Sequence, residues 1–291
     1  MTHLPAGASG PAVNNRKATP PMSDSFVKMM QRLIDRVPVL QKPAYHAYVG
    51  AMAVKQAAYR TSYLKYGRVP KYLSDRGQDR WVIDEVFQGK RGGFFVEFGA
   101  YDGFTDSNTF ALEKHFGWKG LTIEPNPENF RKMTELYKRG CTCVPLAVDA
   151  EPGTLEFVID GQRSGLITKE GDYADTALTA AARAEGRICT VEVLPLADVL
   201  DRYGAPSTID YLSLDVEGLE TRVMRHFPFD RYRFLTMTVE RPTPELNEIL
   251  FANKYHFVRN SLYDSFYIHE SLPNFDEIPR MPFEQLPAKA F

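Results

Sequence analysis

The chain has 291 residues and a formal net charge of −2, with 44% hydrophobic and 25% charged residues. This composition is that of a globular protein with enough apolar material for a full core, and it excludes a strongly basic protein that would attract nucleic acid through its global field. The three cysteines, Cys141, Cys143 and Cys189, form no C-x-x-C pair, so we expect core thiols and a reducing, cytoplasmic location.

The first quarter of the chain separates into two predicted segments. Residues 1–24 are rich in Pro, Gly, Ala and Ser and are predicted to form a disordered tail. Residues 25–76 are predicted to form a helical extension, interrupted at Pro38 and Pro43 and resuming over residues 44–64. We interpret this extension as a packing arm, with contact to a partner or a membrane surface as the alternative. The sequence shows no apolar signal region and no run of about 18 uncharged apolar residues, so we expect no transmembrane segment.

From Gln78 onward, short apolar runs alternate with helical patterns. The runs are bounded by glycine, proline and polar residues, as buried parallel strands are. The predicted strands are residues 94–98, 121–123, 141–148, 209–214 and 234–239, with an antiparallel excursion at 153–159, a further candidate at 190–194, and two late strands at 255–259 and 265–269. The alternation predicts an α/β domain with a mostly parallel sheet over residues 77–271, followed by a Pro-rich tail at 272–291.

A glycine-rich turn follows the first predicted strand, in the sequence Glu97-Phe-Gly-Ala-Tyr-Asp-Gly103. Such a strand and turn place a nucleotide-type cofactor across the carboxyl end of the strand, and glycine is needed where a Cβ would strike the ligand or where φ is positive. The spacing is Gly-x-x-x-Gly rather than the dinucleotide pattern Gly-x-Gly-x-x-Gly. Glu97 and Asp102 would repel a pyrophosphate, whereas they suit a ligand that carries an ammonium group and a cationic sulfur.

Later residues extend this candidate cofactor site. Glu124 follows the second predicted strand, 21 residues after Gly103. A carboxylate at that distance accepts hydrogen bonds from ribose hydroxyls, and a solvated carboxylate before Pro125 is the alternative. After the third predicted strand, Val148 and Asp149 are expected to meet an adenine ring.

These residues belong to a series of motifs that resembles the FkbM-type methyltransferases. The matching segments are Gly93-Phe-Phe-Val-Glu-Phe-Gly-Ala-Tyr-Asp-Gly103, Ser107-Asn-Thr109, Gly117-Trp-Lys-Gly120, Ile123-Glu-Pro-Asn-Pro127 and Asp210-Tyr-Leu-Ser-Leu-Asp-Val-Glu-Gly218, with Gly77-Gln-Asp79 upstream and Tyr263-Asp-Ser-Phe-Tyr267 downstream. They cover roughly residues 78–267, about two thirds of the chain. Phe98 replaces the aliphatic residue of many relatives, a departure that leaves the turn intact.

The resemblance implies a class I methyltransferase fold, which is Rossmann-like, with a mostly parallel seven-stranded sheet and helices on both faces. It also implies S-adenosylmethionine as the cofactor and O-methylation of a hydroxyl on a sugar, glycan or natural-product acceptor. The segment Gln162-Arg-Ser-Gly-Leu166 is predicted to form a loop near the site. The predicted cofactor-binding residues are Glu97, Gly99, Ala100, Asp102, Gly103, Glu124, Val148 and Asp149.

Asp215-Val-Glu217-Gly218 follows the strand at 209–214, which places two carboxylates at the carboxyl edge of the sheet. Methyl transfer to an alcohol needs an oxygen nucleophile about 3 Å from the methyl carbon and a base for its proton. Asp215 or Glu217 is the hypothesised base, with Glu240 after the next strand as a further candidate. The alternative is that Asp215 orients the cofactor amine and Glu217 caps the next helix. The same three carboxylates are a ligand set for a divalent cation, but we expect no metal because no histidine has suitable spacing.

Two other functions stay open at this point. An NAD-dependent Rossmann oxidoreductase would share the ribose role of Glu124, although the third glycine of its turn is missing and the turn is acidic. A non-catalytic interaction protein would keep the fold and use the N-terminal helices as its working surface. For the enzyme, the expected partner is a small-molecule or glycan acceptor, and nothing in the sequence sets the oligomeric state.

Overall fold

The computed structural model describes residues 38–174 and 177–287. The chain divides into a first unit, Met1–Val54, and a second unit, Lys55–Phe291, and the helix α2 (Pro38–Tyr66) crosses this boundary. The helix continues through Pro43, although proline contributes no N–H to it, so the predicted break there was wrong. The predicted tail and the first predicted helix fall in residues 1–37, outside the described residues. Within the described ranges, no helix combines the length and the apolar character needed to cross a bilayer.

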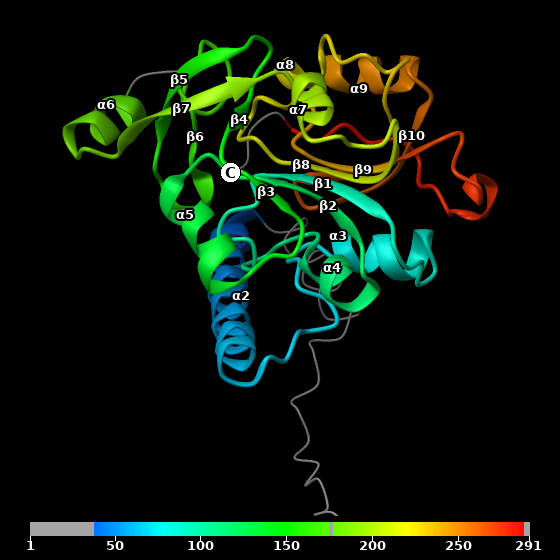
Figure 1. Ribbon diagram of the computed structural model, residues 1–291, viewed down its shortest axis with the longest axis horizontal. Helices are drawn as coiled ribbons and strands as arrows, with labels where there is room; N and C mark the ends of the chain where they lie inside the picture. The colour runs from blue at the N-terminus through cyan, green and yellow to red at the C-terminus, as the bar shows by residue number, and fades with distance from the viewer. Residues whose placement is uncertain (1–37, 175–176, 288–291) are drawn as a thin grey trace, which may run out of the picture. The chain divides into compact units, whose positions relative to one another are not determined.

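A seven-stranded sheet organises the second unit, with the strand order β10-β11-β9-β8-β1-β2-β3 (Figure 1). Neighbouring strands from β9 to β3 run parallel, whereas β11 runs antiparallel to both β9 and β10. The sheet is therefore mixed, with parallel pairing over most of its width. Its strands are β1 (Phe94–Phe98), β2 (Lys119–Ile123), β3 (Thr142–Val144), β8 (Thr208–Leu214), β9 (Arg233–Glu240), β10 (Tyr255–Ser261) and β11 (Asp264–His269).

Helices pack on both faces of this sheet because its strands are apolar on both sides. Val96 and Phe98 of β1 belong to a buried cluster with side chains of α7, α8 and α9, whereas Phe95 belongs to the other cluster, with side chains of η1 and α4. Figure 1 shows α7, α8 and α9 on one side of the strands and α3 and α4 on the other. The bounds are α3 (Gln78–Arg80), the π-helical turn η1 (Trp81–Val86), α4 (Phe110–Phe116), α7 (Leu196–Arg202), α8 (Glu220–Met224) and α9 (Pro244–Ala252).

A second, four-stranded sheet has the order β4-β7-β5-β6. The single strand predicted over residues 141–148 is in fact two: β3 ends at Val144 and pairs in the large sheet, and β4 begins at Ala147 and pairs in the small one. Pro145 separates them, since proline donates no ladder hydrogen bond. The predicted antiparallel excursion is confirmed as β5 paired with β7. The strands are β4 (Ala147–Val148), β5 (Gly153–Val158), β6 (Gly165–Leu166) and β7 (Ile188–Leu194).

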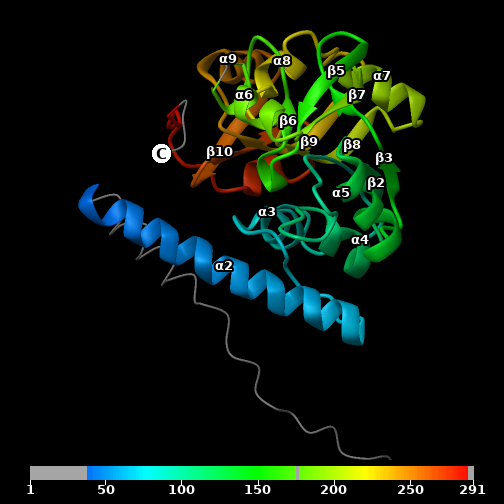
Figure 2. The same ribbon diagram turned by 90° about the vertical axis from the view of Figure 1, so that its left-hand side faces the viewer.

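The remaining elements connect the two sheets and cover their edges. Figure 2 shows β5, β6 and β7 beside α6 and away from α3 and α4. After β11 the chain returns to β10, where the Met281 amide donates to the Val258 carbonyl oxygen at 2.8 Å, so this tail covers an edge strand. The elements not yet bounded are α5 (Pro127–Arg131), η2 (Lys132–Leu136), η3 (Gly161–Arg163), α6 (Ala177–Ala184) and η4 (Phe275–Glu277).

Candidate functional site

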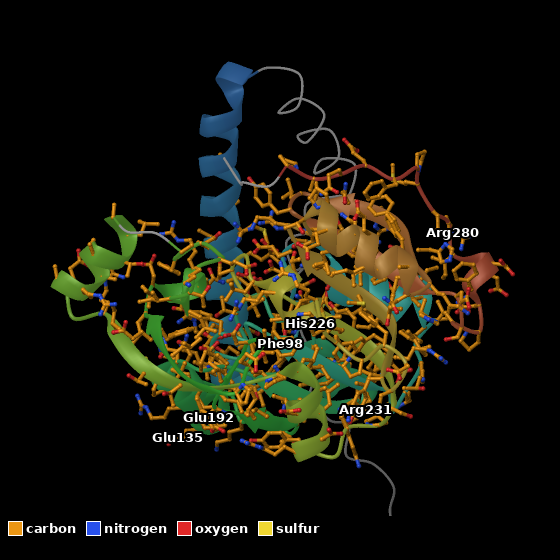
Figure 3. All side chains as sticks on the ribbon, turned by 90° about the horizontal axis from the view of Figure 1, so that it is seen from above. Phe98, Glu135, Glu192, His226, Arg231 and Arg280 are labelled. Carbon is orange, nitrogen blue, oxygen red and sulfur yellow. The ribbon has the colours of Figure 1, made fainter. Side chains whose placement is uncertain are left out.

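A pocket opens to solvent at the carboxyl ends of β1 and β2. Its walls are mainly apolar, as those of small-molecule sites are. Phe98, which forms part of the wall, lies among the strands in Figure 3, whereas Glu192 and Arg231 lie toward the outside. The lining residues are Phe98, Gly99, Ile123, Glu124, Pro125, Ala147, Val148, Phe157, Ser164, Gly165, Leu166, Asp215, Val216 and Leu219.

The two glycines of the predicted turn are required by neighbouring protein atoms. Gly99 has a φ of +62°, and a Cβ on it would lie 2.5 Å from the backbone oxygen of Asp215. Gly103 has a φ of +76°, and its Cβ would lie 2.5 Å from Cγ of Met133 in η2. Both positions therefore favour glycine through the backbone angle and through packing. Gly99 lines the pocket, but Gly103 does not.

Glu97 lies outside the pocket wall, although it was predicted to bind the cofactor. Its carboxylate is buried and accepts hydrogen bonds from the Ser107 hydroxyl, the Asn108 amide at 2.7 Å and the Thr109 hydroxyl at 2.6 Å. Arg139, itself buried, lies 3.5 Å away. Glu97 thus holds the loop before α4 in place, and a direct contact with cofactor stays a prediction.

Asp102 also has partners within its own loop. One carboxylate oxygen accepts the amides of Phe104 and Thr105 at 2.9 and 2.7 Å, and the other accepts the Thr105 hydroxyl at 2.8 Å. The side chain therefore stabilises the turn, as Asp commonly does through its own backbone. Ala100 is buried and its amide donates to the Ile123 oxygen at 3.4 Å, which ties the turn to β2. Neither residue lines the pocket.

Glu124 is placed in the pocket as predicted, at the carboxyl end of β2. Its two oxygens accept the amides of Tyr101 at 2.9 Å and Asn126 at 2.9 Å, so the carboxylate links the β1 turn to the start of α5. Burial is the main influence on its acidity and raises its pKa to about 7. Each oxygen keeps a second lone pair that a hydroxyl donor in the pocket can use.

The two residues expected at the adenine have separate positions. Val148 lines the pocket at the end of β4. Asp149 is turned away into a bidentate ion pair with Arg222, whose Nη2 lies 3.0 Å from one carboxylate oxygen. The pocket wall at this end is therefore apolar, and the Asp149 carboxylate is already satisfied.

The small sheet supplies the roof of the pocket. Phe157 from β5 and Ser164, Gly165 and Leu166 from the following hairpin lie over the ends of the large sheet. The predicted loop at 162–166 is therefore adjacent to the site. Gly165 is needed there because a Cβ would lie 2.9 Å from the Tyr173 ring. The roles of Phe157 and Leu219 were not predicted, since periodicity marks apolar residues as buried without saying which sheet they face.

The three candidate bases have different surroundings. Glu217 and Glu240 both accept from Nη2 of Arg241, at 3.2 and 2.9 Å. Asp215 lines the pocket and, within the part of the chain that the structure describes, forms no ion pair. Glu220, which was not predicted, is buried and accepts the amides of Val216 and Gly218 at 3.0 and 3.2 Å. It is therefore Glu220, not Glu217, that caps the turn before α8.

These carboxylates share one electrostatic environment. Burial, followed by the charge of Glu240, raises the pKa of Asp215 well above its ordinary value. The same two causes raise the pKa of Glu217 to about 8 and that of Glu220 to about 7. Oxygens of Asp215, Glu220 and Glu240 lie within 4.8 Å of one another, so these three, with Glu220 in place of Glu217, could hold a metal ion. A cationic group in the pocket would favour their ionised forms.

Comparison with known proteins identifies the second unit with one family. The family model described as "Methyltransferase FkbM domain" matches residues 97–270. No curated protein matches the chain. Among solved structures, a precorrin-6y C5,15-methyltransferase from Geobacter metallireducens GS-15 is 11% identical over 65% of this chain and 84% of its own, with a TM-score of 0.34. A methyltransferase from Pyrococcus furiosus is 13% identical over 75% and 95%, also with a TM-score of 0.34. These two similarities are too distant to add to the argument.

Proposed function

The chain belongs to the FkbM methyltransferase family, and we propose that it transfers a methyl group from S-adenosylmethionine to a hydroxyl group on a sugar, glycan or natural-product acceptor. The family membership disfavours the NAD-dependent alternative. The strand order of the large sheet, with β11 antiparallel between β9 and β10, supports the class I methyltransferase fold.

The residues around the pocket fit this cofactor at both ends. The apolar wall formed by Ile123, Val148 and Leu166 suits an adenine ring, and the Glu124 carboxylate beside it suits the two hydroxyls of a ribose. At the other end, the acids near Asp215 outnumber the arginine paired with them, Arg241. This end of the pocket therefore suits a sulfonium cation. When bound, the cofactor supplies an electrophilic methyl group on that sulfonium.

Asp215 is the residue that we propose as the general base. The observation that carries this choice is that Asp215 lines the pocket without an ion-pair partner among the described residues, whereas Glu217 and Glu240 share the partner Arg241. Because burial raises its pKa, the Asp215 carboxylate binds a proton more strongly than an ordinary aspartate does. In the ionised form that a cationic ligand favours, it can accept the proton of an acceptor hydroxyl as the oxygen becomes a nucleophile. Arg241 holds the neighbouring acids in position.

The test is a methyl-transfer assay on cell extract as the source of acceptors, with isotopically labelled S-adenosylmethionine and mass spectrometry of the products. We expect a product that is heavier by one methyl group replacing hydrogen and that, as a methyl ether, resists hydrolysis by base. Asp215→Asn should lower turnover about 10²- to 10⁴-fold, the range for loss of a general base. Glu217→Gln, a matched loss of charge at an ion-paired position, should have a smaller effect. Equal effects of the two variants would contradict the choice of Asp215.

A product methylated on nitrogen or carbon would contradict the proposed acceptor class while leaving the enzyme class intact. Cofactor binding without transfer to any acceptor would instead favour the non-catalytic alternative.

A further inference from the structure

Asn108 lies in the loop between the β1 turn and α4, and the Glu97 side chain fixes its backbone position. The Glu97 carboxylate accepts the Asn108 amide at 2.7 Å, and it also accepts the hydroxyls of the two flanking residues, Ser107 and Thr109. Three consecutive residues are therefore held by one buried side chain at the end of β1. This arrangement fixes the backbone from which the Asn108 side chain extends.

In the Asn108 side-chain amide, the nitrogen forms a hydrogen bond and the oxygen, within the described part of the chain, does not. Its Nδ2 donates to the Ser213 hydroxyl at 2.8 Å, which orients the group. Its Oδ1 is buried, and among the described residues no donor lies within hydrogen-bond distance of it. A buried amide oxygen without a donor is unfavourable, so such an atom calls for an explanation. A donor on a bound ligand would supply one.

The strand order shows which part of a ligand reaches Asn108. Ser213 is the penultimate residue of β8, which ends at Leu214, and Asp215 directly follows the strand. The strands follow in the order β8, β1, β2, and Glu124 stands at the end of β2. A ligand whose ribose lies on Glu124 and that crosses β1 at Gly99 therefore has its far end at Asp215. Asn108 does not itself line the ligand-free pocket, and its hydrogen bond to Ser213, two residues before Asp215, is what places it near that end.

The far end of S-adenosylmethionine and of its product is an amino acid, and its ammonium group carries only donors. We propose that Asn108 Oδ1 accepts a hydrogen bond from this ammonium, and that Glu97 is a positioning residue that holds Asn108 rather than a contact to the cofactor. This inference rests on the proposed function, because it requires that ligand in the pocket. It reassigns the acid of the turn from ligand binding to support of a neutral amide.

The experiment compares two ligands that differ only in the ammonium group. S-adenosylhomocysteine carries it, and 5′-S-(3-carboxypropyl)-5′-thioadenosine lacks it. Calorimetric titration of both into the full chain is repeated with Asn108→Ala, Asn108→Asp and the control Asn253→Ala. Asn253 is an asparagine at the end of α9 whose Nδ2 donates to the Ile249 oxygen at 2.8 Å, remote from the pocket.

The expected result is a loss confined to one ligand and one variant. Asn108→Ala should lower the affinity for S-adenosylhomocysteine about ten- to hundredfold, as loss of a hydrogen bond to a charged group does. Its affinity for the analogue should stay within about twofold of that of the wild type. Asn108→Asp keeps an acceptor oxygen and should bind S-adenosylhomocysteine within about threefold of the wild type. Should Asn108→Ala fail to fold, Asn108→Ser, whose hydroxyl is too short to reach, takes its place.

Each contrary result has its own meaning. Equal weakening of both ligands by Asn108→Ala would overturn the inference and show that Asn108 only shapes the loop. Unchanged binding of S-adenosylhomocysteine, or its loss in Asn108→Asp as well as in Asn108→Ala, would also overturn the contact with the ammonium. If the wild type binds neither ligand, the proposed function fails and this inference fails with it, which is distinguishable from the other outcomes.

Discussion

Gly99 and Asp215 meet at the carboxyl ends of β1 and β8, where a Cβ added to Gly99 would lie 2.5 Å from the Asp215 carbonyl oxygen. The contact brings the glycine turn against the strand end that carries the proposed base. The glycine is thus needed to bring two parts of the site together, and the requirement exists before any ligand binds.

Gly99→Ala should therefore destabilise the ligand-free protein. The substitution combines a positive φ with a backbone clash, so we expect the free energy of unfolding to fall by about 2–3 kcal/mol. Gly92→Ala is the control, because Gly92 has a φ of +71° but open space around its missing Cβ, and should cost about 1 kcal/mol. Urea denaturation measures both. Equal losses would show that the contact with Asp215 contributes nothing.

Asp149→Asn should lower the stability of the protein without lowering its affinity for S-adenosylhomocysteine. The Asp149 carboxylate pairs with Arg222, so removing its charge should cost about 1–2 kcal/mol, and Arg222→Gln should cost a similar amount. Because the pair is turned away from the pocket, S-adenosylhomocysteine should bind both variants within about threefold of the wild type. A tenfold loss of affinity in Asp149→Asn alone would restore the predicted adenine contact.

Affinity for S-adenosylhomocysteine should rise with pH through Glu124. Its pKa is raised to about 7 by burial, and ribose hydroxyls donate to the ionised form, so the protonated form is the weaker binder. Between pH 6 and pH 8 the ionised fraction rises roughly tenfold, and the association constant should rise with it. Glu124→Gln should bind more weakly and lose this part of the pH dependence. The same slope in the wild type and in Glu124→Gln would assign it to another group.

The ligand-free protein should become less stable as the pH rises from about 5 to 8.5. The folded-state pKa of Glu220 is raised to about 7 and that of Glu217 to about 8, so the folded protein binds protons more tightly than the unfolded chain. The associated stability is fully present below the unfolded pKa near 4.5 and is lost as the pH rises through the folded values. Glu220→Gln, which keeps the acceptor for Val216 and Gly218, should flatten this profile.

Glu192→Gln is the control for that measurement. Glu192 is exposed on β7 and paired with Arg202 at the surface (Figure 3), so its replacement should leave the slope unchanged. A slope that is the same in Glu220→Gln and in the wild type would show that Glu220 does not titrate in this range.

The sequence was informative where function depends on local order along the chain. The strand before Glu97, the glycine turn and the position of Glu124 all follow from patterns within some 30 residues, and the structure places them at one sheet edge. Asp215 was also predictable, since it directly follows a buried strand. Such signals arise because parallel strands bring their carboxyl ends to the same edge.

What could not be predicted depends on partners far away in the chain. Asp149 looked like a pocket residue until Arg222, 73 residues later, was found to neutralise it. The break at Pro145 moves β4 into a second sheet because β7 is there to pair with it. Glu220 lies outside the recognised motifs, and the motif Ser107-Asn-Thr109 does not show whether its amide side chain is buried or solvated. Burial and pairing decide their roles, and both are set by tertiary contacts.

The most direct test of the account is titration of S-adenosylhomocysteine into the wild type and two variants of the roof hairpin. Ser164 lines the pocket. Gln162, two residues earlier, is exposed, and its Nε2 donates a hydrogen bond to Oδ2 of Asp106 at 3.0 Å. We predict one site per chain in the wild type and in Gln162→Trp, and no binding in Ser164→Trp, whose indole would fill the pocket. Absence of binding to the wild type, or equal binding to all three proteins, would contradict the assignment of this pocket to the cofactor.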